Sequence, residues 1–153
     1  MVGEFVEFEI HYRNEKVEEY YQNSGIQTLG SAGFDLVCAE DIKFEKFGEL
    51  KMIDLGVIIK PPEGYHSLVM PRSSTFKKYG IIQSNSVGLI DEDYCGPEDY
   101  WLFPVIYLKH GTTIIPAGTR VSQFIFQKTE KVTAVKKFNP GGDSRGGFGS
   151  TGN

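Results

Sequence analysis

The sequence is poor in the residues that hold metals or form disulfides. It has two cysteines and three histidines in 153 residues, and Cys38 and Cys95 do not form a CxxC pair. His11, His66 and His110 show neither HExxH nor HxH spacing, which argues against a zinc site. Two isolated cysteines are typical of free thiols in a reducing cytoplasm, and a disulfide between them stays open.

Long hydrophobic runs and a strong charge are also lacking. No apolar stretch approaches ~20 residues, and the opening MVGEFVEFEI has no basic region, so we expect neither a membrane span nor a signal peptide. The net charge of -4 predicts no direct binding to nucleic acid or to anionic membrane. The length and the 40% hydrophobic content predict one globular, cytoplasmic domain with a sizeable core.

Several nucleotide and hydrolase motifs are missing. There is no GxxxxGK[ST] loop and no GxSxG elbow, which argues against a P-loop enzyme and a serine hydrolase. Gly147, Gly149 and Gly152 spell GxGxxG, but only Asn153 follows. A dinucleotide site needs a helix after this motif, so that interpretation fails.

The acidic stretch DEDYCG begins like a calcium loop. It starts at Asp91 and has glycine at its sixth position, but Cys95 and Leu102 stand where an EF-hand needs oxygen ligands. The stretch is therefore no EF-hand.

What the sequence does contain is a series of short β-like runs between turn residues. FVEFEIHY alternates Val6, Phe8, Ile10 and Tyr12 with polar residues, as a half-buried strand does. Similar runs follow in FDLVCA, KMIDLGVIIK, YHSLVM, SVGLID, YWLFPVIYL, RVSQFIF and KVTAVKKF. This spacing predicts an all-β sandwich or barrel.

Helical signals are few. TFKKY, between a serine cap and Gly80, predicts one short helix, while EKVEEYYQ is ambiguous because its apolar positions fit neither period well. The composition changes near Asn139, which divides the chain into a β domain at 1–138 and a glycine-rich arm at 139–153.

Three stretches carry candidate chemistry, and each has a simpler interpretation. Asp91 is a candidate general base beside the ring of Tyr94, or part of an ordinary acidic turn. PRSSTFKKYG places Arg72 and serines at a helix start, which suits an anion or simply caps the helix. Asp35, which follows GSAGF, is a candidate ligand or a turn residue bonded to nearby backbone.

In their order along the chain, these stretches resemble the five motifs of the trimeric dUTPase family. The stretches are GSAGFDL, PRSSTFKKYG, NSVGLIDEDYCG, GTRVSQFIF and RGGFGSTG, of which VGLIDEDY and GGFGSTG are the most specific. The resemblance implies an all-β fold, a distorted jelly-roll of the β-clip type, in a homotrimer whose active sites are shared between subunits. It also implies an enzyme that hydrolyses dUTP to dUMP and pyrophosphate.

The resemblance further implies that the flexible C-terminal arm closes over a neighbouring subunit's site. There Phe148 would stack on uracil, and the glycines around it, Gly149 included, would let backbone approach the phosphates. Arg145, Ser150 and Thr151 would contact the γ-phosphate. Here Arg145 directly precedes GGF, whereas the family often has two further residues between them.

The resemblance assigns the chemistry as well. Asp91 would activate the water that attacks the α-phosphorus, and Asp35 would hold waters of a Mg2+ cofactor bridging the triphosphate. Arg72, Ser73, Ser74 and Gln123 would face phosphates or metal-bound water.

The selectivity for dUTP is implied by the hairpin between Gly80 and Tyr94. Asn85, Gly88 and Ile90 would bond the uracil edge, and Tyr94 would exclude a 2′-hydroxyl. Two alternatives stay open, namely a dCTP deaminase-like enzyme of the same fold family and a nucleotide-gated regulatory protein.

Overall fold

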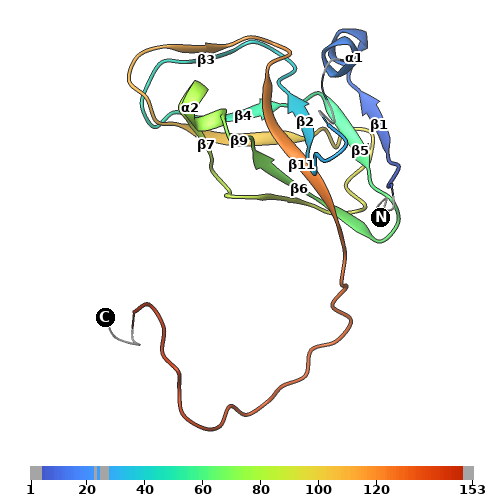
Figure 1. Ribbon diagram of the computed structural model, residues 1–153, viewed down its shortest axis with the longest axis vertical. Coiled ribbons are helices and arrows are strands. Elements are labelled where there is room, and N and C mark those ends of the chain that lie inside the picture. The colour runs from blue at the N-terminus through green and yellow to red at the C-terminus, as the bar shows by residue number, and fades with distance from the viewer. Residues whose placement is uncertain (1–4, 23, 25–27, 150–153) are drawn as a thin grey trace.

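The structure, a computed structural model that describes residues 5–22, 24 and 28–149, is built mostly from short strands (Figure 1). Within these residues, eleven strands and two helices follow one another as β1 (Glu9–Tyr12), α1 (Glu15–Gln22), β2 (Phe34–Val37), β3 (Ile42–Phe44), β4 (Leu50–Asp54), β5 (Val57–Lys60), β6 (Tyr65–Pro71), α2 (Thr75–Tyr79), β7 (Ile81–Gln83), β8 (Gly88–Ile90), β9 (Leu102–Tyr107), β10 (Thr113–Ile115) and β11 (Arg120–Lys128).

The described strands form four antiparallel sheets. The largest has the order β2-β11-β6-β8, the next has the order β4-β9-β7, and β1-β5 and β3-β10 form two-stranded sheets. Strands that are distant in sequence lie side by side, as β2 and β11 do, so the connections cross between sheets. This arrangement confirms the predicted all-β, jelly-roll-like fold.

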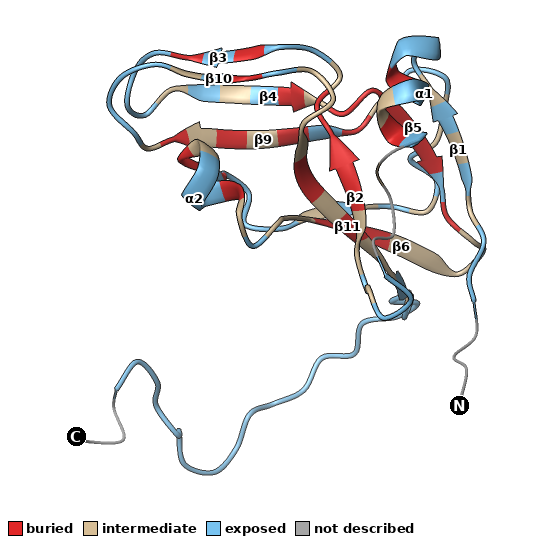
Figure 2. Ribbon diagram, turned by 45° about the horizontal axis from the view of Figure 1, so that its top comes forward, coloured by how far each residue is buried: buried red, intermediate tan, exposed pale blue. Residues whose placement is uncertain are grey.

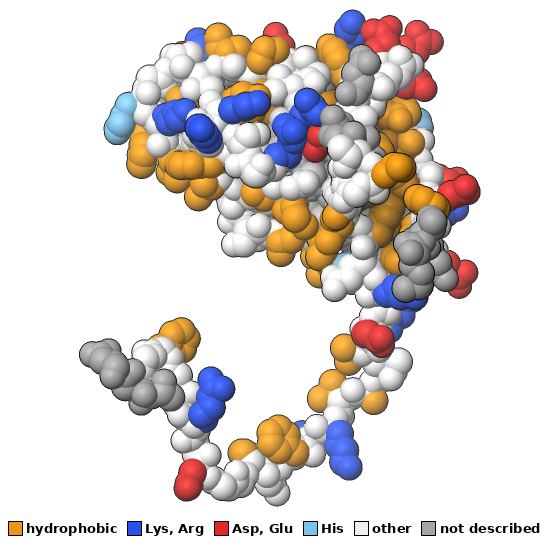
Figure 3. All heavy atoms as spheres, in the orientation of Figure 1, with side chains coloured by type: hydrophobic (Ala, Val, Ile, Leu, Met, Phe, Trp, Pro, Cys, Tyr) orange, Lys and Arg blue, Asp and Glu red, His pale blue; other side chains and the backbone are white. Residues whose placement is uncertain are grey.

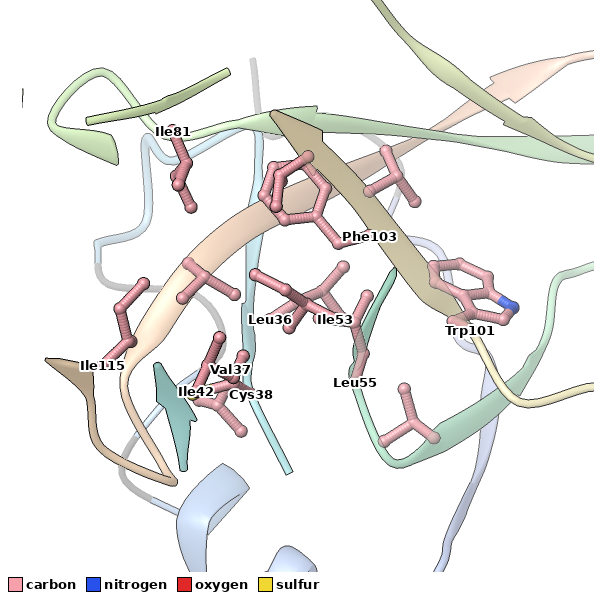
Figure 4. Packing of buried hydrophobic residues seen from close by; sticks show 14 of the residues in the cluster. Leu36, Val37, Cys38, Ile42, Ile53, Leu55, Ile81, Trp101, Phe103 and Ile115 are labelled. Atoms are coloured by element: carbon pink, nitrogen blue, oxygen red, sulfur yellow. The ribbon is translucent and has the colours of Figure 1, made fainter. Parts of the chain in front are cut away.

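The core lies between the two larger sheets. Buried segments of β2 and β11 face buried segments of β4 and β9 (Figure 2). The close view shows side chains from both sheets converging, among them Leu36, Ile53 and Phe103 (Figure 4). Each such side chain stabilises the fold by roughly 1.5–3 kcal/mol through removal of apolar surface from water.

The alternating run at the N-terminus forms the predicted strand, although a shorter one. Phe8, Ile10 and Tyr12 pack against the core, and Glu9 between them is exposed. Val6 lies before β1 and is 42% exposed, so its predicted place on the buried face is wrong.

The predicted short helix is present as α2. It spans Thr75–Tyr79 and ends at Gly80, whose φ of 66° lies in the left-handed region that glycine adopts readily. Ser74 occupies the N-cap position, but its side chain makes no capping hydrogen bond.

A second helix, α1, corrects the prediction of a single helix. Oδ1 of Asn14 accepts a hydrogen bond from N of Val17 at 3.0 Å, which caps the first turn. Val17 and Tyr21, four residues apart, are both buried against the sheets. Tertiary packing of this one face stabilises a helix whose remaining positions are mostly charged.

The last predicted strand, KVTAVKKF, is wrong. Residues 131–138 have neither strand nor helix, because no neighbouring strand pairs with them. Val132, Val135 and Phe138 are between 82% and 90% exposed. The extended segment therefore begins after Lys128, and the division into 1–138 and 139–153 stays a prediction.

Neither cysteine is in a disulfide. Cys38 is buried, and this burial raises the pKa of its thiol. The described helices are too short and too polar for any of them to cross a membrane.

Candidate functional site

A polar pocket lies beside the N-terminal end of β11. The pocket, called here the Asp35 pocket, has a volume of about 370 Å³ and is lined by Ser31, Ala32, Gly33, Asp35, Arg72, Ser73 and Gln123. Its residues come from three segments far apart in sequence. Four of the residues predicted to face phosphate or metal are thereby brought together, namely Asp35, Arg72, Ser73 and Gln123.

Strand register explains this convergence. Gln123 on β11 pairs with Asp35 of β2 on one side and with Met70 of β6 on the other. β6 ends at Pro71, so Arg72 and Ser73 follow the strand directly and lie close to the Asp35–Gln123–Met70 row of the sheet. Nε2 of Gln123 donates a hydrogen bond to the carbonyl of Pro71 at 3.1 Å, which holds the Gln123 side chain at the end of β6.

Asp35 is a buried carboxylate that is neutralised by two arginines. It is 5% exposed, and its Oδ1 lies 3.0 Å from Nε of Arg72. Oδ2 lies 3.3 Å from Nη1 of Arg120. A buried carboxylate without such partners would be costly, so these two contacts offset its burial and fix its orientation.

Arg120 was not assigned a role from the sequence. A usable signal was present, because Arg120 lies in the same GTRVSQ stretch that supplied Gln123. A bulge between Arg120 and Ser122 interrupts the pairing with β2, and the residue remains beside Asp35.

Gly33 allows the pocket to be tightly built. A methyl group at this position would overlap Oε1 of Gln123. The small residue in the GSAGF stretch therefore lets the loop approach the Gln123 side chain.

The start of α2 is fixed by Thr75 rather than by a serine side chain. The Thr75 hydroxyl accepts a hydrogen bond from N of Arg72 at 3.0 Å and donates to the carbonyl of Val121 at 2.9 Å. Thr75 is buried, so these bonds attach the Arg72–Ser73–Ser74 turn firmly to β11. Ser73 is exposed and lines the Asp35 pocket, while Ser74 does not line it.

The predicted uracil-binding residues lie on a separate hairpin. β7 pairs with β9, whereas β8 pairs with β6, so the two arms of the hairpin belong to different sheets. Asn85 is exposed in the turn between them. Gly88 packs closely, since an added methyl group would come within 3.3 Å of Cβ of Val69.

Asp91 and Tyr94 occupy the turn that follows β8. N of Tyr94 donates to the carbonyl of Asp91 at 3.1 Å, and both side chains are exposed. Asp91 lines a cavity of about 850 Å³ together with Leu89 and His66. In the sheet order β2-β11-β6-β8, β8 lies three strand spacings from β2. Gly88 on β8 is therefore at least about 14 Å from Asp35 on β2 within one chain.

The glycine-rich arm extends away from the body of the molecule (Figure 1). Arg145, Phe148 and Gly149 are exposed and touch none of the pockets above. Ser150 and Thr151 lie outside the described residues. A single chain thus brings the predicted phosphate residues together but not the hairpin, Asp91 or the arm.

These observations define a class of protein, a small jelly-roll-like β protein with a polar pocket beside β11 and a long C-terminal arm. A family model described as dUTPase matches residues 20–152. The chain therefore belongs to the dUTPase family.

Sequence relatives agree with this assignment. The SPbeta prophage-derived deoxyuridine 5′-triphosphate nucleotidohydrolase YosS of Bacillus subtilis (strain 168) is 46% identical over 119 residues, which cover 77% of this chain and 82% of that protein. The deoxyuridine 5′-triphosphate nucleotidohydrolase of Rickettsia prowazekii (strain Madrid E) is 37% identical over 149 residues, covering 94% and 97%.

Solved structures share the fold. The dUTPase of Streptococcus mutans superposes with a TM-score of 0.70 at 27% identity, covering 83% of this chain and 98% of that one. The dUTPase of Staphylococcus bacteriophage 80alpha, solved with dUpNHpp, gives a TM-score of 0.74 at 20% identity and covers 95% and 98%.

Proposed function

We propose that this protein hydrolyses dUTP to dUMP and pyrophosphate. The observation that carries the proposal is the Asp35 pocket, because it gathers Arg72, Ser73 and Gln123 in a chain of the dUTPase family. Arginine and hydroxyl groups are suited to phosphate oxygens, and the pocket is large enough for a phosphate chain. Ser74 is the next residue of the same turn.

The reaction is a displacement at the α-phosphorus. Water attacks that atom, the bond to the bridging oxygen of the β-phosphate breaks, and pyrophosphate leaves. Asp91 takes the proton of the water, which is a role that an exposed carboxylate can fill. The cations around the phosphate pocket stabilise charge on the phosphoryl oxygens.

The hairpin supplies selectivity in this proposal. Asn85 and the main chain at Gly88 and Ile90 bond the uracil edge, and Tyr94 lies against the deoxyribose. β7 and β8 are edge strands of two different sheets, and main-chain groups at a sheet edge can bond a base. Cytosine would leave these donors and acceptors mispaired, which is costly in a closed site.

The site is complete only between subunits in this proposal. Asp91 and the Asp35 pocket are separated in one chain, and Phe148 is fully exposed. A homotrimer that places a neighbour's hairpin and arm over the pocket resolves both observations. Phe148 then stacks on uracil, and Arg145, Gly149, Ser150 and Thr151 close over the γ-phosphate.

The donor set suits a hydrated magnesium ion rather than one held by several protein ligands. Among the described residues, no group of three or more His, Cys, Asp or Glu side chains is arranged to hold a metal. Asp35 uses part of its acceptor capacity on two arginines, which leaves lone pairs for metal-bound water. Bound through the phosphates, Mg2+ would neutralise charge on the reacting oxygens.

Product analysis tests the proposal. The purified protein is incubated with magnesium and, separately, with dUTP, dTTP, dCTP and UTP. We expect dUMP and pyrophosphate from dUTP alone. Ammonia from dCTP would instead indicate a deaminase, and dUTP binding without turnover would indicate a regulatory protein.

The site of attack is tested in water enriched in oxygen-18. Attack at the α-phosphorus places the label in dUMP. Label in pyrophosphate would show attack at the β-phosphorus and would contradict the proposed mechanism.

A further inference from the structure

A second polar pocket adjoins the first and has no role in the function proposed above. This pocket, called here the Lys78 pocket, has a volume of about 270 Å³ and is lined by Tyr20, Ser24, Arg72, Lys78, Tyr79, Gly118, Thr119 and Arg120. It shares Arg72 with the Asp35 pocket. The two pockets are thus neighbours that share one lining residue.

The Lys78 pocket carries a concentrated positive charge. Arg72, Lys78 and Arg120 line it, and none of its lining residues is acidic. Two of these cations, Arg72 and Arg120, contact the carboxylate of Asp35. Three positive charges and one negative charge leave a net charge of about +2, although the whole chain carries -4.

The surface view shows the same feature. Lys and Arg side chains gather in a band across the face that contains α2 and β2, with little acidic surface inside it (Figure 3). Such a band raises the local concentration of anions.

The walls of the Lys78 pocket are firmly built. Gly118 has a φ of 82°, and an added methyl group there would come within 2.7 Å of the Tyr20 ring. The Tyr20 ring therefore packs directly on the Gly118 turn. Another wall comes from α2, where Lys78 lines the pocket and the adjacent Lys77 does not. The helix thus separates two adjacent lysines into one that faces the pocket and one that does not.

We propose that the Lys78 pocket is a second anion site, which binds inorganic pyrophosphate after hydrolysis. The identity of this ligand rests on the proposed function, because the reaction releases pyrophosphate beside Arg72. A compact polyanion with several acceptor oxygens matches a pocket lined by cations and hydroxyl groups. Transfer to this pocket clears the phosphates from the Asp35 pocket while keeping them paired with Arg72.

Calorimetric titration of the full-length protein with pyrophosphate, without nucleotide, tests the proposal. We expect two pyrophosphate ions per chain in the wild type. Lys78→Gln should weaken one of the two sites about tenfold, since it removes one charge-assisted contact. Ser73→Ala should weaken only the other. Inorganic phosphate, titrated in parallel, should bind more weakly at both sites because it offers fewer oxygens.

The matched control is Lys77→Gln, on the same helix and outside the pocket. It should bind both pyrophosphate ions as the wild type does, and thermal melting should show all three variants folded. Equal effects of Lys77→Gln and Lys78→Gln would overturn the proposal, because they would show a diffuse charge effect. One pyrophosphate per chain, lost with Ser73→Ala alone, would overturn it too.

Failure of this inference is distinguishable from failure of the proposed function. If the wild type does not hydrolyse dUTP but pyrophosphate binding still depends on Lys78, the anion site stands and the enzymatic proposal fails. If dUTP is hydrolysed and Lys78→Gln binds pyrophosphate as the wild type does, the anion site is wrong.

Discussion

At the scale of single residues, Asp91 is the position whose chemistry is easiest to isolate. Asp91→Asn keeps the size of the side chain but removes the proton acceptor. We expect turnover of dUTP to fall about 10²- to 10⁴-fold, with binding of the dUTP analogue dUpNHpp retained. Initial rates and calorimetric titration measure the two quantities separately.

The control for Asp91 is Glu63→Gln, because Glu63 lines the same 850 Å³ cavity. It should retain nearly full activity. Hydrolysis by Asp91→Asn at the wild-type rate would exclude Asp91 as the base.

Tyr21 is a residue whose hydroxyl holds together three parts of the fold. Its oxygen donates to the carbonyl of Leu55 at 2.7 Å and accepts from N of Val37 at 3.2 Å. Tyr21→Phe leaves both buried groups unpaired, so the free energy of unfolding should fall by about 1–3 kcal/mol. Denaturant titration measures this change. Tyr20→Phe, for which no hydrogen bond is lost among the described residues, should change it by less than about 0.5 kcal/mol.

Tyr21 also predicts a dependence of stability on alkaline pH. Burial raises the pKa of its hydroxyl, so the folded protein keeps this proton where the unfolded chain loses it. The contribution is fully present below about pH 10, and the free energy of unfolding falls as the pH rises further. Tyr21→Phe should therefore flatten this decline, by at most about 1.4 kcal/mol per pH unit. Identical slopes for both proteins would contradict the assignment.

At the scale of elements, the loop before β2 packs against β11, and this packing can be tested at Gly33. Gly33→Ala should push the Gln123 side chain out of the Asp35 pocket, because the new methyl group overlaps its oxygen. The Gln123 side chain can move, so the fold should survive while KM for dUTP rises about tenfold. Gly30→Ala, which meets no atom within 4 Å, is the control and should leave KM unchanged. Equal KM values for the two variants would contradict the role proposed for Gly33.

The elements that sequence predicted well are those with a clear period. The alternation through Phe8, Ile10 and Tyr12 located β1, and Gly80 located the end of α2. The sequence left α1 ambiguous, because only Val17 and Tyr21 are buried in a segment that is otherwise mostly charged. Its cap at Asn14, three residues before Val17, was the signal that went unused.

The prediction of a strand at KVTAVKKF was wrong for a different reason. A strand needs a neighbour, and a β-like composition does not say whether one is present. The same limit applies to the candidate site. Motif residues identified Asp35 and Gln123, but only the register of β2 with β11 shows that they share a pocket and that Arg120 contacts Asp35.

At the scale of the whole molecule, we expect the arm to be needed for activity but not for stability. Residues 139–149, the described part of the arm, are all exposed, so they contribute almost nothing to the core of one chain. Removal of residues 140–153 should therefore change the free energy of unfolding by less than about 0.5 kcal/mol. Turnover of dUTP should nevertheless fall at least about 100-fold, because the truncated site no longer closes over the substrate and positions it.

Two further measurements on the truncated protein separate closure from assembly. Gel filtration should show the same oligomer as the full-length protein, since the body of the molecule is unchanged. Addition of the missing segment as a synthetic peptide should restore little activity, because ordering a free glycine-rich chain costs more entropy than ordering a tethered one. If the truncated protein turned over dUTP at the full rate, the arm would not be a lid. The exposed Phe148 would then need another explanation.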